Sequence, residues 1–231
     1  MRGKMFSVFL PLVMFANSIF NISSTVDIVE RKIQEENRFI KIEALYPNIE
    51  GENKKTQKNI DKLNKKIKGD IDTWINDLKD LSIKSEHESE LYNVPFRQFQ
   101  IFSTYKVELN KENIVSIPVE QYQDTGGAHG LTTKISYNFD LNNGVMLKLK
   151  DLFKKDYDYT KVINNEIKKQ IDKKSSIYFD NGKSFKGIKE NQDFYITEDS
   201  VVVYFQLYEI APYSSGIREF KIPFSLLKDG I

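Results

Sequence analysis

The chain has no cysteine among its 231 residues and only two histidines. The missing cysteine excludes disulfides, thiolate zinc sites, iron–sulfur clusters and cysteine nucleophiles. Two imidazoles are too few for an all-histidine metal site. An excess of either charge is also lacking, because 34 basic residues face 33 acidic ones and the formal net charge is +1. There is therefore no electrostatic reason to expect a nucleic-acid or polyanion binder.

What the chain does contain is enough apolar surface for a packed core. Hydrophobic residues make up 40% of the sequence and aromatic residues 13%. This composition is typical of a globular protein and not of a disordered chain. The length allows one large domain or two small ones. Composition alone indicates no reaction.

The first residues read as a targeting segment. Arg2 and Lys4 precede an uncharged apolar run over residues 5–16, and small polar residues follow. This is the layout of a secretory signal, so residues 1–24 are predicted to be a signal peptide or an uncleaved N-terminal anchor. No cysteine follows the run, which excludes a lipoprotein anchor. We expect an extracytoplasmic protein, either secreted or tethered to the outer face of the cytoplasmic membrane.

The rest of the chain alternates between strand and helix patterns without repeats. Apolar residues spaced three or four apart predict a long amphipathic helix over residues 54–81, followed by a polar loop over 82–93. A second helix is predicted over 159–173. Alternating runs predict strands over 26–33, 38–46, 96–109, 114–123, 132–141, 145–149, 194–197, 201–207 and 220–223.

This order of elements predicts the fold class. Strands do not alternate with crossover helices, which favours an α+β fold. We expect a mostly antiparallel sheet with the two main helices packed on one face, in two subdomains. The smaller subdomain would be a β-β-α unit over residues 25–92, and the larger α+β subdomain would cover 93–231.

Two acidic stretches resemble metal sites only superficially. Glu86-His87-Glu88 places adjacent side chains in different directions, and no second cluster completes a coordination shell. Asp156 and Asp158 lack the glycine and the twelfth-position glutamate of a calcium loop. We therefore expect no metal and no cofactor.

A glycine-rich stretch ends the predicted strand over 114–123. It places Gly126, Gly127 and Gly130 around His129, so the backbone can adopt conformations forbidden to other residues or another chain can approach closely. The stretch lacks the lysine-serine ending and the following helix of a nucleotide loop. His129 could act as a base but has no partner at a recognisable spacing. A tight corner between two strands is the alternative interpretation.

A second stretch breaks the strand pattern around Pro212 and Gly216. Tyr208, Glu209, Tyr213 and Glu219 place aromatic rings beside carboxylates. Rings offer large contact area at low entropic cost, as sugar-binding and protein-binding surfaces require. The alternative is that the tyrosines cap the open end of the sheet. The predicted ligand-binding residues are Gly126, Gly127, His129, Gly130, Tyr208, Glu209, Tyr213 and Glu219. If they form one site, the two stretches must meet around one surface.

These stretches, taken in order, resemble a known family. The motifs are Gly126-Gly127-Ala128-His129-Gly130, Asn138-Phe139-Asp140-Leu141 with Gly144, Asp151-Leu152-Phe153, and Tyr208-Glu209-Ile210-Ala211-Pro212-Tyr213 with Gly216. They resemble a bacterial extracytoplasmic domain of formerly unknown function. The stretch Ile42 to Ile49 and the long helix resemble its smaller companion domain. The pair occurs in lysozyme-responsive anti-sigma factors and in the non-catalytic part of some peptidoglycan deacetylases.

The resemblance implies a two-part α+β ectodomain at the cell envelope, which in the anti-sigma relatives binds lysozyme directly and so exposes the protein to proteolysis. Only four residues precede the apolar run, and nothing follows the larger domain. We therefore expect neither a sigma-binding segment nor a deacetylase. The predicted function is recognition of a lysozyme-like wall hydrolase or a peptidoglycan fragment without catalysis, with no nucleic acid and with membrane contact only through an uncleaved N-terminal segment.

The alternative function is a wall-glycan hydrolase or lyase. Such an enzyme needs two carboxylates facing each other across a cleft. The candidates are Asp124, Asp140, Glu209 and Glu219, and their spacing singles out no pair.

Overall fold

The computed structural model describes residues 26–231, and the predicted targeting segment over residues 1–24 lies outside them. The strands are β1 (Asp27–Glu36), β2 (Ile40–Glu50), β3 (Phe99–Tyr105), β4 (Leu109–Lys111), β5 (Ile114–Asp124), β6 (Leu131–Asp140), β7 (Val145–Met146), β8 (Phe194–Ile196), β9 (Ser200–Phe205) and β10 (Arg218–Pro223). The helices are α1 (Lys54–Leu91), α2 (Tyr159–Asp172) and α3 (Phe224–Leu227), with short 3₁₀ turns between them. Within residues 26–231, none of the helices is both long and apolar enough to cross a bilayer.

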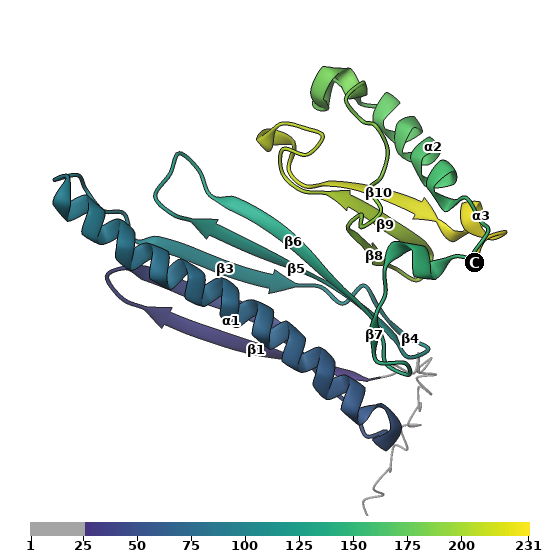
Figure 1. Cartoon of the computed structure of the whole chain (residues 1–231), viewed down its shortest axis with the longest axis horizontal. Helices are drawn as coiled ribbons and strands as arrows, with labels where there is room; N and C mark the ends of the chain where they lie inside the picture. The colour runs from purple at the N-terminus through teal and green to yellow at the C-terminus, as the bar shows by residue number, and fades with distance from the viewer. Residues whose placement is uncertain (1–25) are drawn as a thin grey trace, which may run out of the picture.

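The first lobe is built on a seven-stranded sheet in the order β1-β2-β3-β5-β6-β7, with β4 paired to β5 (Figure 1). Its neighbouring strands are antiparallel except for β2 and β3, which are parallel. A parallel pair needs a long crossover connection, which α1 supplies with 38 residues. With a rise of 1.5 Å per residue, α1 is about 57 Å long and lies lengthwise on one face of the sheet.

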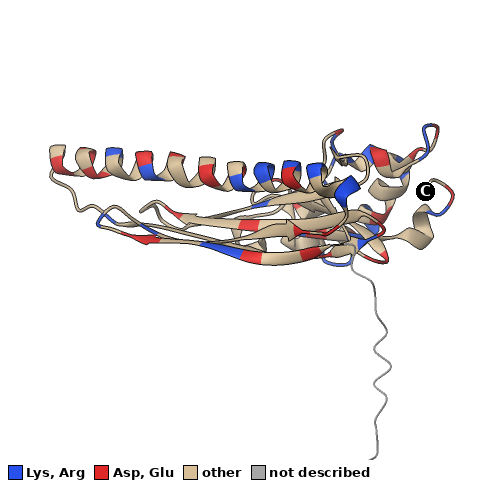
Figure 2. Cartoon of the chain, turned by 90° about the horizontal axis from the view of Figure 1, so that it is seen from below, with Lys and Arg blue, Asp and Glu red and all other residues tan. Residues whose placement is uncertain are grey.

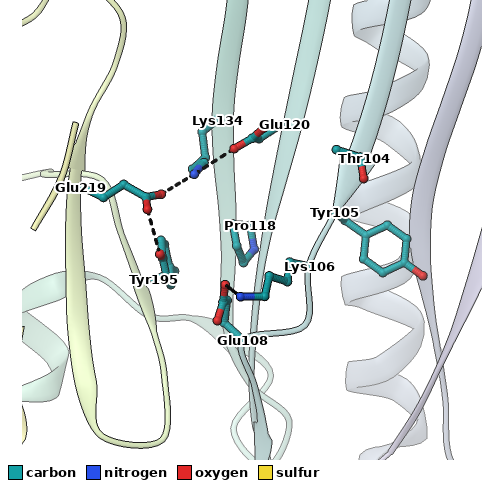
Figure 3. Close-up of a pocket in the computed structure, with 9 residues that line it drawn as sticks. All are labelled: Thr104, Tyr105, Lys106, Glu108, Pro118, Glu120, Lys134, Tyr195 and Glu219. Carbon is teal, nitrogen blue, oxygen red and sulfur yellow. Dashed lines mark hydrogen bonds and ion pairs between the residues drawn. The ribbon is translucent and has the colours of Figure 1, made fainter. Parts of the chain in front are cut away.

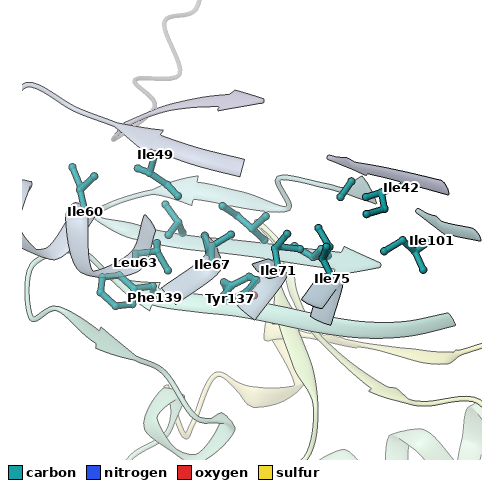
Figure 4. Packing of buried hydrophobic residues seen from close by; sticks show 14 of the residues in the cluster. Ile42, Ile49, Ile60, Leu63, Ile67, Ile71, Ile75, Ile101, Tyr137 and Phe139 are labelled. Atoms are coloured by element: carbon teal, nitrogen blue, oxygen red, sulfur yellow. The ribbon is translucent and has the colours of Figure 1, made fainter. Parts of the chain in front are cut away.

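The periodicity of α1 explains this packing. The side chain of Asn53 caps its first turn by accepting a hydrogen bond from the backbone N–H of Lys55 (3.0 Å). Ile60, Leu63 and Ile67 belong to an apolar stripe that lies against the sheet residues Tyr137 and Phe139 (Figure 4). The exposed side of the helix is charged along its length, with lysines predominating over residues 54–68 and acidic residues over residues 69–91 (Figure 2). This side of the helix is solvated.

The prediction of a polar loop over residues 82–93 was wrong, because α1 continues to Leu91. The apolar stripe stops near Leu81, so periodicity gives no signal for the last turns. Two buried serines lie in these turns and donate hydrogen bonds to carbonyls three residues back: Ser82 to Lys79 (2.8 Å) and Ser89 to Glu86 (2.7 Å). These bonds satisfy the two buried hydroxyls in the part of the helix that lacks an apolar stripe.

The second lobe is a smaller antiparallel sheet in the order β10-β9-β8, covered on one face by α2 and α3. Asp158 caps α2 by accepting from the N–H of Lys161 (3.1 Å). Ile163, Ile167 and Ile171 form the buried stripe of α2. The predicted α+β class with mostly antiparallel pairing is therefore confirmed, and the strands divide into two sheets, each with a main helix on one face.

The two lobes have separate hydrophobic cores. The buried residues of the first core run from Val26 to Leu141, and those of the second run from Leu149 to Leu227. The predicted boundary between residues 92 and 93 falls inside the first core, because β2 and α1 share a sheet and a core with β3, β5 and β6. Parallel pairing of β2 with β3 across 48 intervening residues leaves no signal in local sequence patterns.

The lobes are joined by buried hydrogen bonds, beside a small third cluster of Tyr195, Val202 and Tyr204. Strand β8 is the edge of the second sheet and lies against the face of β5 and β6 that points away from α1. Asn138 donates to the carbonyl of Phe194 (2.8 Å), and Ser116 accepts from the N–H of Ile196 (2.8 Å). Ser116 also donates to Asn138 (2.6 Å). These two side chains thus satisfy backbone groups that a neighbouring strand would otherwise satisfy.

Candidate functional site

The two stretches singled out in the sequence meet in space. The loop between β5 and β6 carries His129 and Gly130, and the turn between β9 and β10 carries Tyr208 and Tyr213. The hydroxyl of Tyr213 donates to the carbonyl of Gly130 (2.9 Å), and its ring stacks on His129 with 4.0 Å between centroids. The ring of Tyr208 lies 5.8 Å from that of Tyr213. We call His129, Tyr208 and Tyr213 the aromatic corner.

Hydrogen bonds fix the orientation of the imidazole. Nδ1 of His129 lies 3.0 Å from the carbonyl oxygen of Gly130, and Nε2 lies 3.1 Å from the hydroxyl of Tyr208. A carbonyl can only accept, so Nδ1 carries a proton that it donates to Gly130, and Nε2 shares a second hydrogen bond with the Tyr208 hydroxyl. Both ring nitrogens are thereby engaged. The imidazole is positioned as a rigid part of the surface.

Tyr208 adopts an unusual backbone conformation. Its φ is +67°, in the left-handed region that bulky residues rarely occupy, and the residue is 51% exposed. The turn is held by Glu209, which accepts from the N–H of Gln206 (2.6 Å) and pairs with Lys189 (2.5 Å). Strain of this kind concentrates at functional sites when the surrounding structure maintains it.

The three glycines of the loop occupy different structural environments. Gly126 has φ +84°, and its N–H donates to Asp124 (2.9 Å). A Cβ on Gly130 would lie 2.3 Å from the hydroxyl of Tyr122, so only glycine fits there. Gly127 is exposed, and its carbonyl accepts from Arg97 (3.0 Å). Gly126 and Gly130 therefore shape the loop that presents His129.

The two predicted carboxylates do not join the aromatic corner. Glu209 serves the turn through Lys189 and Gln206. Glu219 points into a groove between the lobes, where it pairs with Lys134 and accepts from the hydroxyl of Tyr195 (3.2 Å) (Figure 3). The corner is thus a surface of rings, with its nearest carboxylates already compensated.

Lys134 was missed by the sequence patterns. It is 9% exposed and pairs with both Glu120 (3.0 Å) and Glu219. Its ammonium lies 5.8 and 5.7 Å from the ring centroids of Tyr195 and Tyr204. Burial alone would lower its pKa, but the hydrogen bonds and charges of the two glutamates raise the pKa above its ordinary value. In the sequence, Lys134 is visible only as a charged residue on the strand face that also carries Ser136 and Asn138.

The carboxylates considered for glycan chemistry serve separate structural roles. Asp124 pairs with Arg97 (3.3 Å), and Asp140 accepts from the N–H groups of Asn142 and Asn143 in the turn after β6. Glu209 and Glu219 have the partners given above. The geometry therefore singles out no acid–base pair among these four residues.

Neither acidic stretch gathers metal ligands. Glu86 pairs with Arg38 (3.2 Å), and His87 is exposed on the last turns of α1. Asp158 is the cap of α2. Within residues 26–231, no group of three or more histidine, aspartate or glutamate side chains is arranged to hold a metal ion.

Two protein-family models match the chain, one in each lobe. Residues 33–132 match the model described as deacetylase PdaC, and residues 150–225 match the model described as a protein of unknown function, DUF3298. The interval between the two matches contains the step from the first core to the second. The family resemblance read from the motifs is confirmed, since one segment of the chain matches the PdaC model and another matches the DUF3298 model.

Two curated relatives come from Bacillus subtilis (strain 168). The chain is 33% identical over 129 residues to the peptidoglycan-N-acetylmuramic acid deacetylase PdaC, covering 54% of this chain and 28% of the relative. It is 34% identical over 138 residues to the anti-sigma-V factor RsiV, covering 56% of this chain and 47% of the relative. The chain thus matches less than half the length of each relative.

Solved structures show the same fold at lower identity. A DUF3298 family member from Bacteroides fragilis NCTC 9343 superposes with a TM-score of 0.67 at 20% identity, covering 90% of this chain and 94% of that one. A DUF3298 family protein from Pseudomonas aeruginosa PAO1 gives a TM-score of 0.53 at 16% identity, covering 89% and 93%. The two-lobe arrangement is therefore shared by the solved proteins.

Proposed function

We propose that this chain, in which one segment matches the PdaC model and another matches the DUF3298 model, is an exported binding module of the bacterial cell envelope. It recognises a lysozyme-like wall hydrolase and has no catalytic activity of its own. Support comes from the two relatives, since one is named for a peptidoglycan sugar and the other as an anti-sigma factor. The apolar run after Arg2 and Lys4 supports export.

The observation that carries the proposal is the aromatic corner. Three rings from both lobes are held rigidly at one surface by mutual stacking and by hydrogen bonds to Gly130. Tyrosines held in this way give contact area without the entropic cost of ordering flexible side chains. A strained, half-exposed Tyr208 adds to this, because strain is retained where the conformation serves binding.

The ion pairs of Glu209 and Glu219 indicate which side chains would contact the partner. Glu209 pairs with Lys189, and Glu219 shares Lys134 with Glu120, so neither carboxylate is free to pair with a basic partner. The rings of Tyr208 and Tyr213 are therefore the anchors, and the carboxylates keep those anchors in place. Binding should depend weakly on salt, because paired surface charges release little energy to a partner.

Calorimetric titration of the full chain with a c-type lysozyme tests the proposal. We expect wild-type binding, and Tyr208→Ala and Tyr213→Ala should each weaken it about tenfold or more. Tyr92→Ala is the matched control, since Tyr92 is an exposed tyrosine at the far end of α1. Heat with soluble muropeptides but not with lysozyme would reassign the ligand to peptidoglycan. No heat with either would overturn the binding role.

The enzyme alternative is addressed by a separate assay. Asp124, Asp140 and Glu209 are held in structural pairs or turns, which supports a module without catalysis. Incubation of the chain with purified muropeptides, followed by chromatography, should give no products. Product formation that disappears in Glu219→Gln would instead establish a glycan-active enzyme using the interlobe carboxylates.

A further inference from the structure

A groove separates the two lobes on the side opposite α1. One part has a volume of about 420 Å³ and is lined mainly by Thr104, Glu108, Pro118, Tyr195 and their neighbours. A second part of about 500 Å³ extends to Leu207, Tyr213 and Ile217. Glu120, Lys134 and Glu219 line both parts, so the two parts adjoin at these three side chains, and together we call them the interlobe groove. Junctions between lobes are frequent ligand sites.

The centre of the groove is a rigid cluster of charges. Lys134 bridges Glu120 and Glu219, and Tyr195 donates to the second oxygen of Glu219 (Figure 3). The side chains of Glu120 and Glu219 remain 46% and 36% exposed. Their carboxylates can therefore accept further hydrogen bonds from a ligand without losing Lys134. Acceptors that are held in place before binding lose little entropy on binding.

The charge balance of the groove indicates the class of ligand. Glu108 pairs with Lys106 (2.7 Å), so each of its two lysines has a carboxylate partner in the same groove. Because Lys134 is shared by Glu120 and Glu219, the groove holds three carboxylates and two lysines. An anionic ligand would therefore meet no free cation and would be repelled by the excess carboxylate. A neutral ligand rich in hydroxyl and amide groups can instead donate to the exposed carboxylates in charge-assisted hydrogen bonds.

The walls of the groove also contain apolar residues. Pro118 lies between the Lys134 cluster and the Lys106–Glu108 pair, as Figure 3 shows. Leu207, Tyr213 and Ile217 line the other part. Apolar surfaces interrupted by fixed acceptors match a sugar ring, which has an apolar C–H face and a polar edge of hydroxyls. An open groove suits a chain of such rings better than a single small molecule.

We propose that the interlobe groove binds a neutral glycan chain, with the carboxylates of Glu120 and Glu219 accepting hydrogen bonds from sugar hydroxyl or N-acetyl groups. The groove shares Tyr213 with the aromatic corner, but the proposed acceptors Glu120 and Glu219 lie outside that corner. The glycan site rests on the proposed function only in taking the cell wall as the source of the glycan.

The test uses the β-1,4-linked tetrasaccharide of N-acetylglucosamine as the probe, added to the ¹⁵N-labelled full chain. We expect amide shift changes around Thr104, Glu120 and Lys134, with saturable binding. Glu120→Gln and Glu219→Gln should each weaken binding about tenfold, because each loses a charge-assisted acceptor. Asp72→Asn is the matched control, since Asp72 is paired with Lys68 (2.5 Å) on the outer face of α1.

Folding of the variants is checked in the same experiment. Glu120→Gln leaves Lys134 paired with Glu219, so its amide spectrum should stay dispersed like that of the wild type. Absence of shift changes at millimolar probe, or changes confined to His129 and Tyr208, would overturn the proposal. Equal binding by wild type and both glutamine variants would also overturn it.

Titration of the same samples with lysozyme separates this proposal from the proposed function. Lysozyme binding without tetrasaccharide binding would remove the glycan site and leave the hydrolase-binding role intact. Tetrasaccharide binding without lysozyme binding would support the glycan site and overturn the hydrolase-binding role. His129→Ala should reduce only lysozyme binding, and Glu120→Gln should reduce only tetrasaccharide binding.

Discussion

The imidazole of His129 and the phenol ring of Tyr213 stack with centroids 4.0 Å apart and an interplanar angle of 24°. His129 belongs to the first lobe and Tyr213 to the second, so the contact exists only when the lobes are docked. The aromatic corner is therefore a composite surface. Its integrity depends on the junction formed by Ser116 and Asn138 as well as on its own residues.

Two substitutions of Tyr213 should distinguish the contribution of its hydroxyl to stability from that of its ring. Tyr213→Phe removes the hydrogen bond to Gly130 and keeps the stacking, so we expect the free energy of unfolding to fall by about 1 kcal/mol. Tyr213→Ala removes both and should cost about 2 kcal/mol. Urea denaturation measures the difference. Equal losses in the two variants would show that the stacking contributes nothing.

Tyr208 should show a trade-off between stability and binding. Tyr208→Gly relieves the positive φ, whereas Tyr208→Ala keeps a Cβ in the same strained backbone. We expect the glycine variant to be about 1 kcal/mol more stable than the alanine variant. Both should lose lysozyme binding. A glycine variant that unfolds at a lower temperature than the alanine variant would contradict the role of strain.

Asn138 should be essential for docking of the second lobe. Asn138→Ala leaves the carbonyl of Phe194 without its donor and the hydroxyl proton of Ser116 without its acceptor in a buried site. The expected loss is about 2–3 kcal/mol in the free energy of unfolding. Asn76→Ala, at an exposed position of α1, is the control and should change stability little. Comparable effects of the two substitutions would contradict this role.

Stability should decrease at alkaline pH through buried tyrosines. Burial, with the charge and hydrogen bond of Asp70, raises the pKa of Tyr137 far above its ordinary value. The unfolded chain ionises this phenol near pH 10, while the folded chain keeps it neutral. Its contribution is therefore complete below about pH 10 and is lost as the pH rises further.

The variant Tyr137→Phe checks this dependence. It should lose less stability than the wild type between about pH 9 and pH 11 in urea denaturation. Some dependence should remain, because burial also raises the pKa of Tyr195 and Tyr204. Identical pH profiles for the variant and the wild type would contradict the assignment.

Local patterns were enough to predict most elements of this fold. The apolar stripe of α1, the strand alternation and the Asn142-Asn143-Gly144 turn all reflect neighbours within a few residues. The pairing of β2 with β3 could not be predicted in this way, because it depends on partners separated by the whole of α1. The end of α1 was missed because its last turns bury serines and no apolar stripe, so they carry no helical period of apolar residues.

The candidate site was predictable in part for similar reasons. His129 and Tyr208 stood out because they interrupt the strand patterns beside glycine and proline. Lys134 and Glu120 did not, since a charge on a strand ordinarily indicates solvent. Only the arrangement of the lobes shows that Lys134 is buried between two carboxylates. Sequence patterns identify unusual loops more readily than charges buried between lobes.

The separation of the two cores has a consequence for the order of folding. Every residue of the first core precedes Leu149, so a chain emerging N-terminus first can complete that core before the second has been synthesised. During that interval Ser116 and Asn138 have no strand to cap and remain hydrated on an open sheet face. Docking of β8 would then be the last step, at which both the aromatic corner and the interlobe groove form together.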